Sequence, residues 1–401
     1  MLYIISNILF LSEISGLFRL NTKLNIFITG KKKNKNCVCE REDGKLIMDI
    51  IPAVPAPEFK GIEAWANSKP IFLRDLKHRV VLLDCWTYTC VFCLRTIPIL
   101  KRLQQKYQKY GFQIIQAHSA EYEFARDTTN VYKALARYDI KDIPVAIDSN
   151  NKTWEAYGNS YWPKHVLIDQ NNFVRYEHAG YGDIRDFEVV IRELLGEENK
   201  QPLDEDFDAD NPSDEIFDTY GMHFPGIAPE ICVGYSRLRR FGNNQTMKPD
   251  VANFTTDPGF HVENVVYLSG KWIWQRESIK PCLDSSSSSS SSSYSSPSSD
   301  GTKSKKYSSI IMRYNSAKRV HAIMGSSDSK TARIEIKLDG NYVQQNQLGK
   351  DMKVKKEDGI SYSDIEWPFM NNLIRTEKPE IHEIEIIPKT DNVMFYTFVF
   401  G

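Results

Sequence analysis

The sequence predicts an α/β domain followed by an all-β sandwich, and two patterns support this fold class. Segments typical of strands and of helices alternate between residues 50 and 196, which is typical of a three-layer α/β domain. Between residues 229 and 401 one strand-like segment follows another, as in an antiparallel sandwich. The chain has 401 residues, a length that suggests two or three domains.

The α/β domain is predicted to begin with a buried strand and an amphipathic helix. Residues 80–83 form a continuous apolar run, as expected for a strand buried on both faces. Pro98 lies within the following helical segment and should kink it. Five apolar residues of this segment are spaced to share one helix face: Leu94, Ile97, Leu100, Leu103 and Tyr107.

The other predicted elements of this domain complete the alternation. Further strands are expected at 112–117, 145–147, 165–168 and 173–176. Further helices are expected at 128–138, 153–157 and 187–195, and the last two are each followed by a glycine.

The sandwich is predicted from alternating apolar and polar residues. Residues 332–338 and 381–387 alternate, Asp339-Gly340 is a turn sequence, and 393–400 is an aromatic-rich final strand. Nine consecutive serines lie within 284–306, which we expect to be a disordered loop inserted into the sandwich.

Two further segments are predicted to lie outside the folded domains. Residues 1–49 read as a poorly ordered leader, although a secretory signal is an alternative. Residues 197–228 read as an acidic linker, since 10 of the 22 residues at 197–218 are Asp or Glu.

Composition excludes several classes of protein. The net charge is −1, which argues against a dedicated nucleic-acid binder. No apolar run is long enough for a transmembrane helix. Seven cysteines are too few for a disulfide-stapled scaffold, and the absence of a clear signal favours a cytoplasmic location.

One motif carries strong chemistry. Cys90 and Cys93 are separated by Val91-Phe92 and stand between a buried strand and a helix. A cysteine at a helix N-terminus is favoured as a thiolate, which attacks disulfides. We therefore expect Cys90 to attack and Cys93 to resolve, forming a Cys90–Cys93 redox disulfide. This chemistry needs no cofactor. A zinc site would need four ligands, and no matching pair is near, so no metal is expected.

Residues 83–98 resemble the thioredoxin-fold proteins of the TlpA and DipZ type, also called redoxins. Segments 154–159 and 161–165 match later signatures of that family, and 395–401 is similar to the end of the β-sandwich domain that follows thioredoxin in DipZ. The resemblance implies a thioredoxin fold, then a jelly-roll-like, carbohydrate-binding-like sandwich. It implies a thiol–disulfide oxidoreductase that acts on protein disulfides.

The resemblance also implies roles for further residues. Asp84 takes the place of a buried aspartate that accepts the proton of Cys93, with a strand-end polar residue as the alternative. Pro163 takes the place of the cis-proline that leaves the Trp162 backbone free to pair with a substrate strand. Trp86 flanks the site or packs in the core. Glu121 tunes the cysteines or is an ordinary loop residue.

Departures from the family pattern bear on partners. Val91-Phe92 replaces the Gly-Pro of reducing thioredoxins, and Cys85 is an extra thiol expected to be buried and inert. The membrane electron-transfer domain of DipZ is missing from this sequence. We therefore expect a soluble reductant, such as a thioredoxin or glutathione system.

Two other functions stay open at this point. One is a peroxiredoxin-like antioxidant, because Thr87 stands three residues before Cys90, although Leu83 replaces the proline of that family. The other is a ligand-binding or scaffold protein that acts through the sandwich. Trp272, Trp274 and Trp367 are candidates to stack on a sugar, with core packing as the alternative.

Overall fold

The computed structural model describes residues 54–180, 184–196, 219–221, 223, 225–283 and 307–401. The predictions for the leader at 1–49, for the acidic segment at 197–218 and for the serine-rich loop at 284–306 fall outside the described residues. Residues Ile50–Gly401 form one compact unit.

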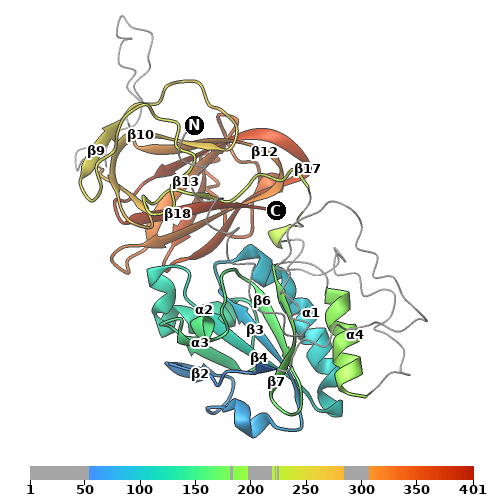
Figure 1. Ribbon diagram of the computed structural model, residues 1–401. Coiled ribbons are helices and arrows are strands. Elements are labelled where there is room, and N and C mark those ends of the chain that lie inside the picture. The colour runs from blue at the N-terminus through green and yellow to red at the C-terminus, as the bar shows by residue number, and fades with distance from the viewer. Residues whose placement is uncertain (1–53, 181–183, 197–218, 222, 224, 284–306) are drawn as a thin grey trace, which may run out of the picture. The chain divides into compact units, whose positions relative to one another are not determined.

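The first half of this unit is built on a seven-stranded mixed sheet (Figure 1). The strand order is β1-β7-β6-β3-β4-β5-β2, with β3, β4 and β5 parallel to one another and the other pairs antiparallel. The strands are β1 Val54–Pro55, β2 Ala64–Ala66, β3 Val80–Trp86, β4 Phe112–Ser119, β5 Val145–Asp148, β6 Lys164–Ile168 and β7 Phe173–Ala179. This architecture confirms the predicted α/β class.

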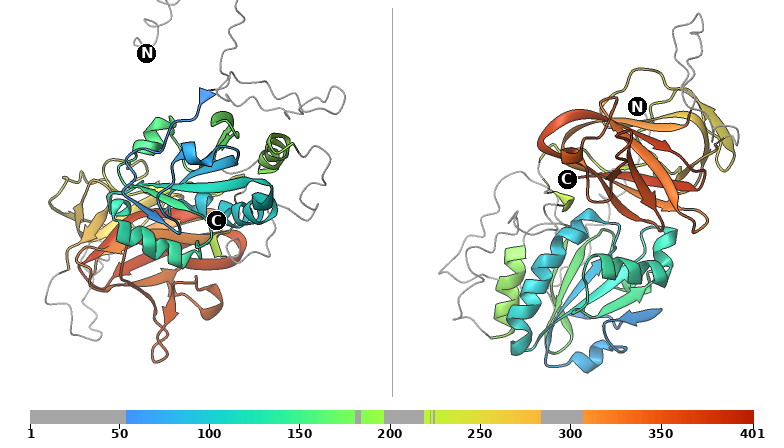
Figure 2. Two further views of the ribbon diagram at one scale, coloured as in Figure 1. Left: turned by 90° about the horizontal axis from the view of Figure 1, so that it is seen from below. Right: turned by 180° about the vertical axis from the view of Figure 1, so that it is seen from behind.

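Helices cover both faces of this sheet. They are α1 Val91–Tyr107, α2 Thr128–Arg137, α3 Lys152–Ala156 and α4 Ile184–Leu194, with short 3-10 helices at Leu73–Leu76, Gln108–Tyr110 and Glu123–Arg126. Helices α1 and α4 run side by side (Figure 2), and α3 packs on the opposite face through Trp154. Helix α4 begins three residues before the predicted start at Phe187.

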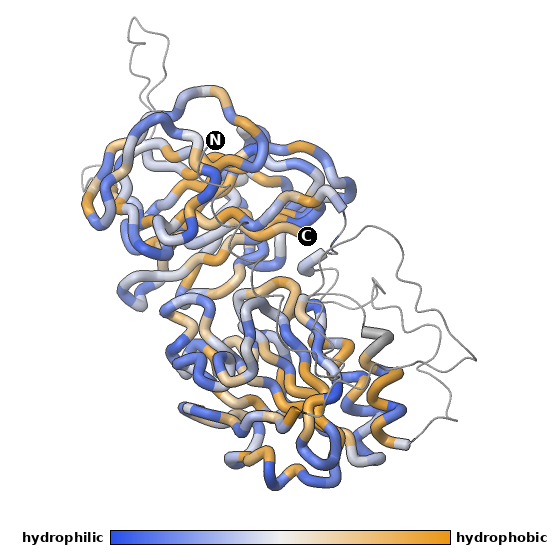
Figure 3. Tube along the Cα trace, viewed as in Figure 1, coloured by the Kyte–Doolittle hydropathy of each residue, from blue (hydrophilic) through white to orange (hydrophobic). Residues whose placement is uncertain are grey.

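Apolar periodicity explains these elements. Every residue of β3 is buried, as the apolar run at 80–83 predicts for its first four residues. The five apolar residues predicted to share one face of α1 are all buried. Figure 3 shows apolar residues concentrated along the inner strands of this sheet.

The second half is an antiparallel β-sandwich, as predicted. Its pairing order is β15-β16-β13-β17-β12-β10-β11-β18-β8. In addition, β14 pairs with β13, and β9 pairs with β10. Strands β12 and β17 are 18 and 20 residues long and pair along their length with register shifts. The strands are β8 Ile231–Cys232, β9 Ala252–Thr255, β10 Val265–Trp274, β11 Ile279–Pro281, β12 Ser309–Ser326, β13 Ala332–Leu338, β14 Asn341–Tyr342, β15 Lys353–Val354, β16 Ser361–Ile365, β17 Phe369–Pro388 and β18 Val393–Phe400, with a 3-10 helix at Gln345–Gln347.

Candidate functional site

The two cysteines of the motif lie where β3 passes into α1. Cys90 is the N-cap residue of α1, and its sulfur accepts the Cys93 backbone N–H at 3.3 Å. Cys90 is partly exposed, whereas only 1% of Cys93 is exposed. A short loop allows this arrangement, because the Cys90 N–H is bonded to the Thr87 carbonyl at 3.2 Å. One sulfur is thus accessible, and the other is shielded from water.

Burial sets the acidity of Cys93. Its pKa is raised well above the usual value, first by desolvation and then by the neighbouring Cys90 and the charge of Asp84. A buried thiol of this kind stays protonated until a nearby base removes its proton.

Asp84 is a buried carboxyl group on β3. Burial raises its pKa to about 7, and a hydrogen bond from Gln116 opposes that shift. The Gln116 amide donates to Asp84 Oδ2 at 2.9 Å, and His165 Nε2 lies 3.3 Å from Asp84 Oδ1. His165 was not singled out from the sequence, because only strand pairing brings it beside Asp84.

Glu121 is connected to the active-site loop and to the sandwich. Its carboxylate accepts the Thr89 hydroxyl at 2.7 Å and pairs with the Arg237 guanidinium at 2.8 Å. Thr89 directly precedes Cys90 in the chain. Glu121 is therefore held in place beside the site, which distinguishes it from an ordinary solvated loop residue.

The other predicted site residues occupy two different environments. The Trp162–Pro163 peptide bond is cis, and the Trp162 ring stacks on Trp154 with centroids 4.2 Å apart. Trp162 is half-buried, and Tyr161 before it is 70% exposed. Trp86 is fully buried and its ring meets His118 edge-on at 5.4 Å, which agrees with its core interpretation.

The apolar cluster that the dithiol segment packs against includes residues of the sandwich. Cys90, Phe92 and Trp162 contact one apolar cluster. The members that this cluster takes from β12, β17 and β18 are Ile323, Met370, Tyr396 and Val399. No local sequence signal could have found these contacts, since they join residues at least 161 positions apart in the chain.

Of the three tryptophans considered for sugar stacking, Trp272 is buried, whereas Trp274 and Trp367 are half-buried. Trp272 is fully buried in the sandwich core, and Trp274 packs against that core while its indole N–H donates to the Val233 carbonyl at 2.8 Å. Trp367 lies against Phe369, with ring centroids 4.8 Å apart, and against Tyr88. The sugar-stacking interpretation is wrong for Trp272, because a buried ring offers no face to a ligand.

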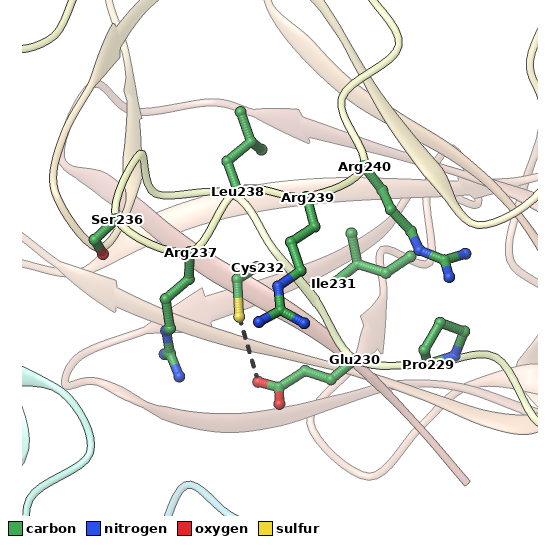
Figure 4. Close-up of a pocket in the computed structure, with 9 residues that line it drawn as sticks. All are labelled: Pro229, Glu230, Ile231, Cys232, Ser236, Arg237, Leu238, Arg239 and Arg240. Atoms are coloured by element: carbon green, nitrogen blue, oxygen red, sulfur yellow. Dashed lines mark hydrogen bonds between the residues drawn. The ribbon is translucent and has the colours of Figure 1, made fainter. Parts of the chain in front are cut away.

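A cavity of about 450 Å³ opens along residues 229–240 (Figure 4). Cys232 lies in its wall with Glu230, 3.7 Å from sulfur to carboxylate. Burial raises the pKa of Cys232 to about 11 and that of Glu230 to about 7. The Cys232 thiol is thus poorly suited to attack a disulfide.

The extra thiol of β3, Cys85, is also unreactive, because its surroundings keep it protonated. Cys85 is buried, and desolvation raises its pKa to about 12. Among the described residues no group of three His, Cys, Asp or Glu side chains is placed to bind a metal ion. In the same part of the chain, no helix is both long and apolar enough to cross a membrane.

Comparison with known proteins identifies the family. The chain is similar to the thiol-disulfide oxidoreductase ResA of Bacillus thuringiensis subsp. konkukian (strain 97-27), with 31% identity over 150 residues that make up 37% of this chain and 73% of ResA. The chain belongs to the thiol-disulfide oxidoreductases. The family described as Redoxin matches residues 52–191 of this oxidoreductase, and the family described as thioredoxin like C-terminal domain matches residues 292–401.

The chain is also similar to part of a much longer protein and to one small solved structure. Protein DipZ of Mycobacterium bovis is 33% identical over 223 residues, which are 54% of this oxidoreductase and 30% of DipZ. The chain thus spans less than a third of the length of DipZ. A solved thiol:disulfide interchange protein DsbE from Chlorobium tepidum is 28% identical, with 37% of this chain and 98% of that chain covered and a TM-score of 0.31.

Proposed function

We propose that this oxidoreductase reduces or exchanges protein disulfides with the Cys90–Cys93 dithiol. The observation that supports this most directly is the unequal placement of the two sulfurs. Cys90 caps the N-terminus of α1 and is partly exposed, whereas Cys93 is buried and its pKa is raised. The N–H groups of a helix N-terminus favour negative charge on a sulfur there.

The proposed reaction has two exchange steps. The Cys90 thiolate attacks a substrate disulfide, so that the substrate S–S bond breaks, a Cys90–substrate bond forms and one substrate thiolate leaves. Cys93 then gives its proton to Asp84 and attacks the Cys90 sulfur. The second substrate thiolate leaves, and Cys90 and Cys93 are joined as a disulfide. Two electrons have passed to the substrate.

Two neighbouring groups support this scheme. Asp84 is the proposed base for Cys93, because its carboxyl group is buried on the strand that leads to the dithiol and its charge acts on that thiol. Trp162 and Pro163 are the proposed contact for a substrate strand, since Trp162 packs against the same cluster as Cys90. A soluble dithiol protein or glutathione is the proposed reductant that restores the dithiol.

A trapping experiment tests the assignment of the two sulfurs. We expect Cys93→Ser to accumulate a mixed disulfide with a protein substrate that contains a disulfide bond, because no second cysteine then resolves the Cys90 adduct. Cys90→Ser should form no adduct. The measurement is non-reducing electrophoresis and mass analysis of the purified proteins.

The matched control is Cys85→Ser, which removes a buried thiol next to the same loop. It should resolve its adducts like the unmodified protein. Equal trapping by the Cys90 and Cys93 variants, or no trapping by either, would contradict the proposed function.

The two alternative functions receive less support from the site. The Thr87 hydroxyl lies 3.2 Å from the Thr89 hydroxyl, which itself donates to the Glu121 carboxylate. Thr87 is therefore engaged with Thr89, which leaves its hydroxyl poorly placed to bind a peroxide. A scaffold role through the sandwich loses Trp272 as a ligand-stacking group. No observation favours either function over disulfide exchange.

A further inference from the structure

Four polar side chains form a straight row across the α/β sheet. Strand pairing places His178 of β7 opposite His165 of β6, His165 opposite Asp84 of β3, and Asp84 opposite Gln116 of β4. Directly paired residues point to the same face of a sheet with Cβ atoms about 5 Å apart. We call these four residues the polar row.

The inner end of the polar row is close to the dithiol. Gln116 donates to Asp84 Oδ2 at 2.9 Å, and His165 Nε2 is 3.3 Å from Asp84 Oδ1. The charge of Asp84 acts on the buried Cys93 thiol. Asp84 thus has Cys93 as one neighbour and His165 as another.

The outer end of the polar row lies on β7, in a stretch that β1 does not pair with in the described part of the chain. The rings of His165 and His178 both meet the Phe187 ring of α4 edge-on, with centroids 5.1 and 5.7 Å away. Within the described residues, β1 pairs with β7 only at Val174 and Phe173, so no described strand pairs with β7 at His178 on that side. His178 is half-buried, whereas His165 is 2% exposed.

The buried atoms of the polar row are poorly satisfied by hydrogen bonds. Among the described residues, Asp84 Oδ1, both ring nitrogens of His165 and Nε2 of His178 have no aligned partner. Leaving such groups buried costs free energy, so natural cores rarely hold several of them together. Three adjacent residues with free proton-binding atoms indicate a use other than stability.

We propose that the polar row carries the proton of Cys93 from Asp84 through His165 to His178 and so to solvent, an inference that rests on the proposed function. Asp84 gives the proton to Nε2 of His165, which releases a proton from its other nitrogen to His178. His178 loses it at the sheet edge. Asp84 is again a carboxylate, and the net change is one proton moved to water.

His165 is suited to pass a proton on, and it does not stay protonated itself. Burial and the charge of His178 lower its pKa to about 3, so the ring is neutral at rest. A neutral imidazole accepts a proton at one nitrogen and donates from the other. Around the row, α1 contributes Cys93 and α4 the apolar ring of Phe187. The ionisable groups of the row and its surroundings are therefore Cys93, Asp84 and the two histidines.

The test separates the two exchange steps with Ellman's reagent, an aromatic disulfide. Attack by Cys90 releases one coloured thiolate, and resolution by Cys93 releases the second. The experiment uses the full chain. It keeps Cys85, Cys90 and Cys93, and the other four cysteines are changed to serine: Cys37, Cys39, Cys232 and Cys282. At about pH 6 Asp84 holds a proton, since its pKa is about 7. It must then lose that proton through the row before it takes the one from Cys93.

We expect His165→Leu and His178→Ala to slow the second release about tenfold at pH 6, less than the ~100-fold loss typical of removing a general base itself. The first release should not change. Above about pH 8 the difference should vanish, because Asp84 is then already ionised. Imidazole in the buffer should restore the second release in His178→Ala, where it can occupy the opened edge.

The matched control is Tyr176→Phe, which lies on β7 and also packs against Phe187, at 5.2 Å, but pairs with Leu167 outside the row. It should keep both release rates. A second release that is unchanged in folded His165→Leu and His178→Ala, or slowed equally at all pH values without imidazole rescue, overturns the relay. Loss of both release phases in the parent protein would instead overturn the proposed function.

Discussion

At the scale of single residues, Asp84 shows how a functional group opposes stability. Its carboxyl group is 1% exposed, and burial raises its pKa to about 7 from an ordinary value of 3.8. A buried carboxylate without a full set of partners costs free energy whenever it is ionised. The fold tolerates this cost at the position that we propose for the base that serves Cys93.

This shift predicts how Asp84→Asn changes stability with pH. Between about pH 4 and pH 7 the folded protein keeps a proton on Asp84 that the unfolded chain has lost, so stability falls as pH rises through this window. Three pKa units correspond to about 4 kcal/mol. We expect Asp84→Asn to become more stable than the parent by up to about 4 kcal/mol above pH 7.

Denaturant unfolding of both reduced proteins at several pH values measures this difference. Near pH 4 Asp84 is protonated in the folded state of the parent, and the two proteins should differ little. A stability gap that stays constant between pH 4 and pH 8 would contradict the assigned shift.

At the scale of elements, the short helix α3 depends on one buried carboxylate. Asp148, at the end of β5, accepts the backbone N–H groups of Lys152 and Trp154 at 2.7 and 2.8 Å. Trp154 in turn stacks on Trp162 beside the candidate site. The hydrogen bonds of Asp148 thus position one wall of the site through α3.

We expect Asp148→Ala to lower stability by about 1–3 kcal/mol, because it removes the acceptor of the buried Trp154 N–H and of the partly buried Lys152 N–H. The melting temperature measures the loss. Asp148→Asn keeps one side-chain oxygen acceptor and should lose less. An equal loss in both variants would show that the side-chain oxygens do not hold α3.

At the scale of the whole molecule, the α/β and sandwich halves share an ion pair and an apolar cluster. Arg137 of α2 donates to both oxygens of Asp351 at 2.7 Å, and Asp351 also accepts two hydrogen bonds from Asn372 of β17. Tyr88 and Tyr396 belong to an apolar cluster that includes residues of both halves. These contacts make residues 50–401 a single compact unit.

We expect Asp351→Ala to destabilise the protein by about 3–5 kcal/mol, since it leaves the partly buried Arg137 and Asn372 groups without their acceptor. Calorimetry should show a lower melting temperature in one shared transition. The control is Asp364→Ala, which breaks an ion pair with the more exposed Arg333 inside the sandwich and should cost about 1 kcal/mol or less. Two separate transitions, with only one shifted, would contradict coupling of the halves.

Sequence patterns predicted the elements wherever the signal was local. The face of α1, the buried strand β3 and the alternation in β13 follow from the spacing of apolar residues along a few turns or a few residues. Long strands were harder. Residues 381–387 were predicted as a strand, but β17 extends from Phe369 to Pro388 because its partner β12 continues the pairing.

The candidate site divides in the same way. Cys90 and Cys93 are recognisable from the sequence, because their spacing and their place between a strand and a helix are local features. The position of His165 beside Asp84 is not, since it depends on the register between β3 and β6, which brings together residues 81 positions apart in the chain. The burial of Trp272 also depends on neighbours from several strands.

By itself, the sequence determined the class of the two halves and the chemistry of the dithiol, because hydrophobic period and motif spacing are properties of short segments. The tertiary structure decided which groups surround that dithiol. Strand register aligned Asp84, His165 and His178 on one face, and packing brought Glu121 to Arg237. Such contacts join distant segments, and their free energy depends on burial that only the folded chain creates.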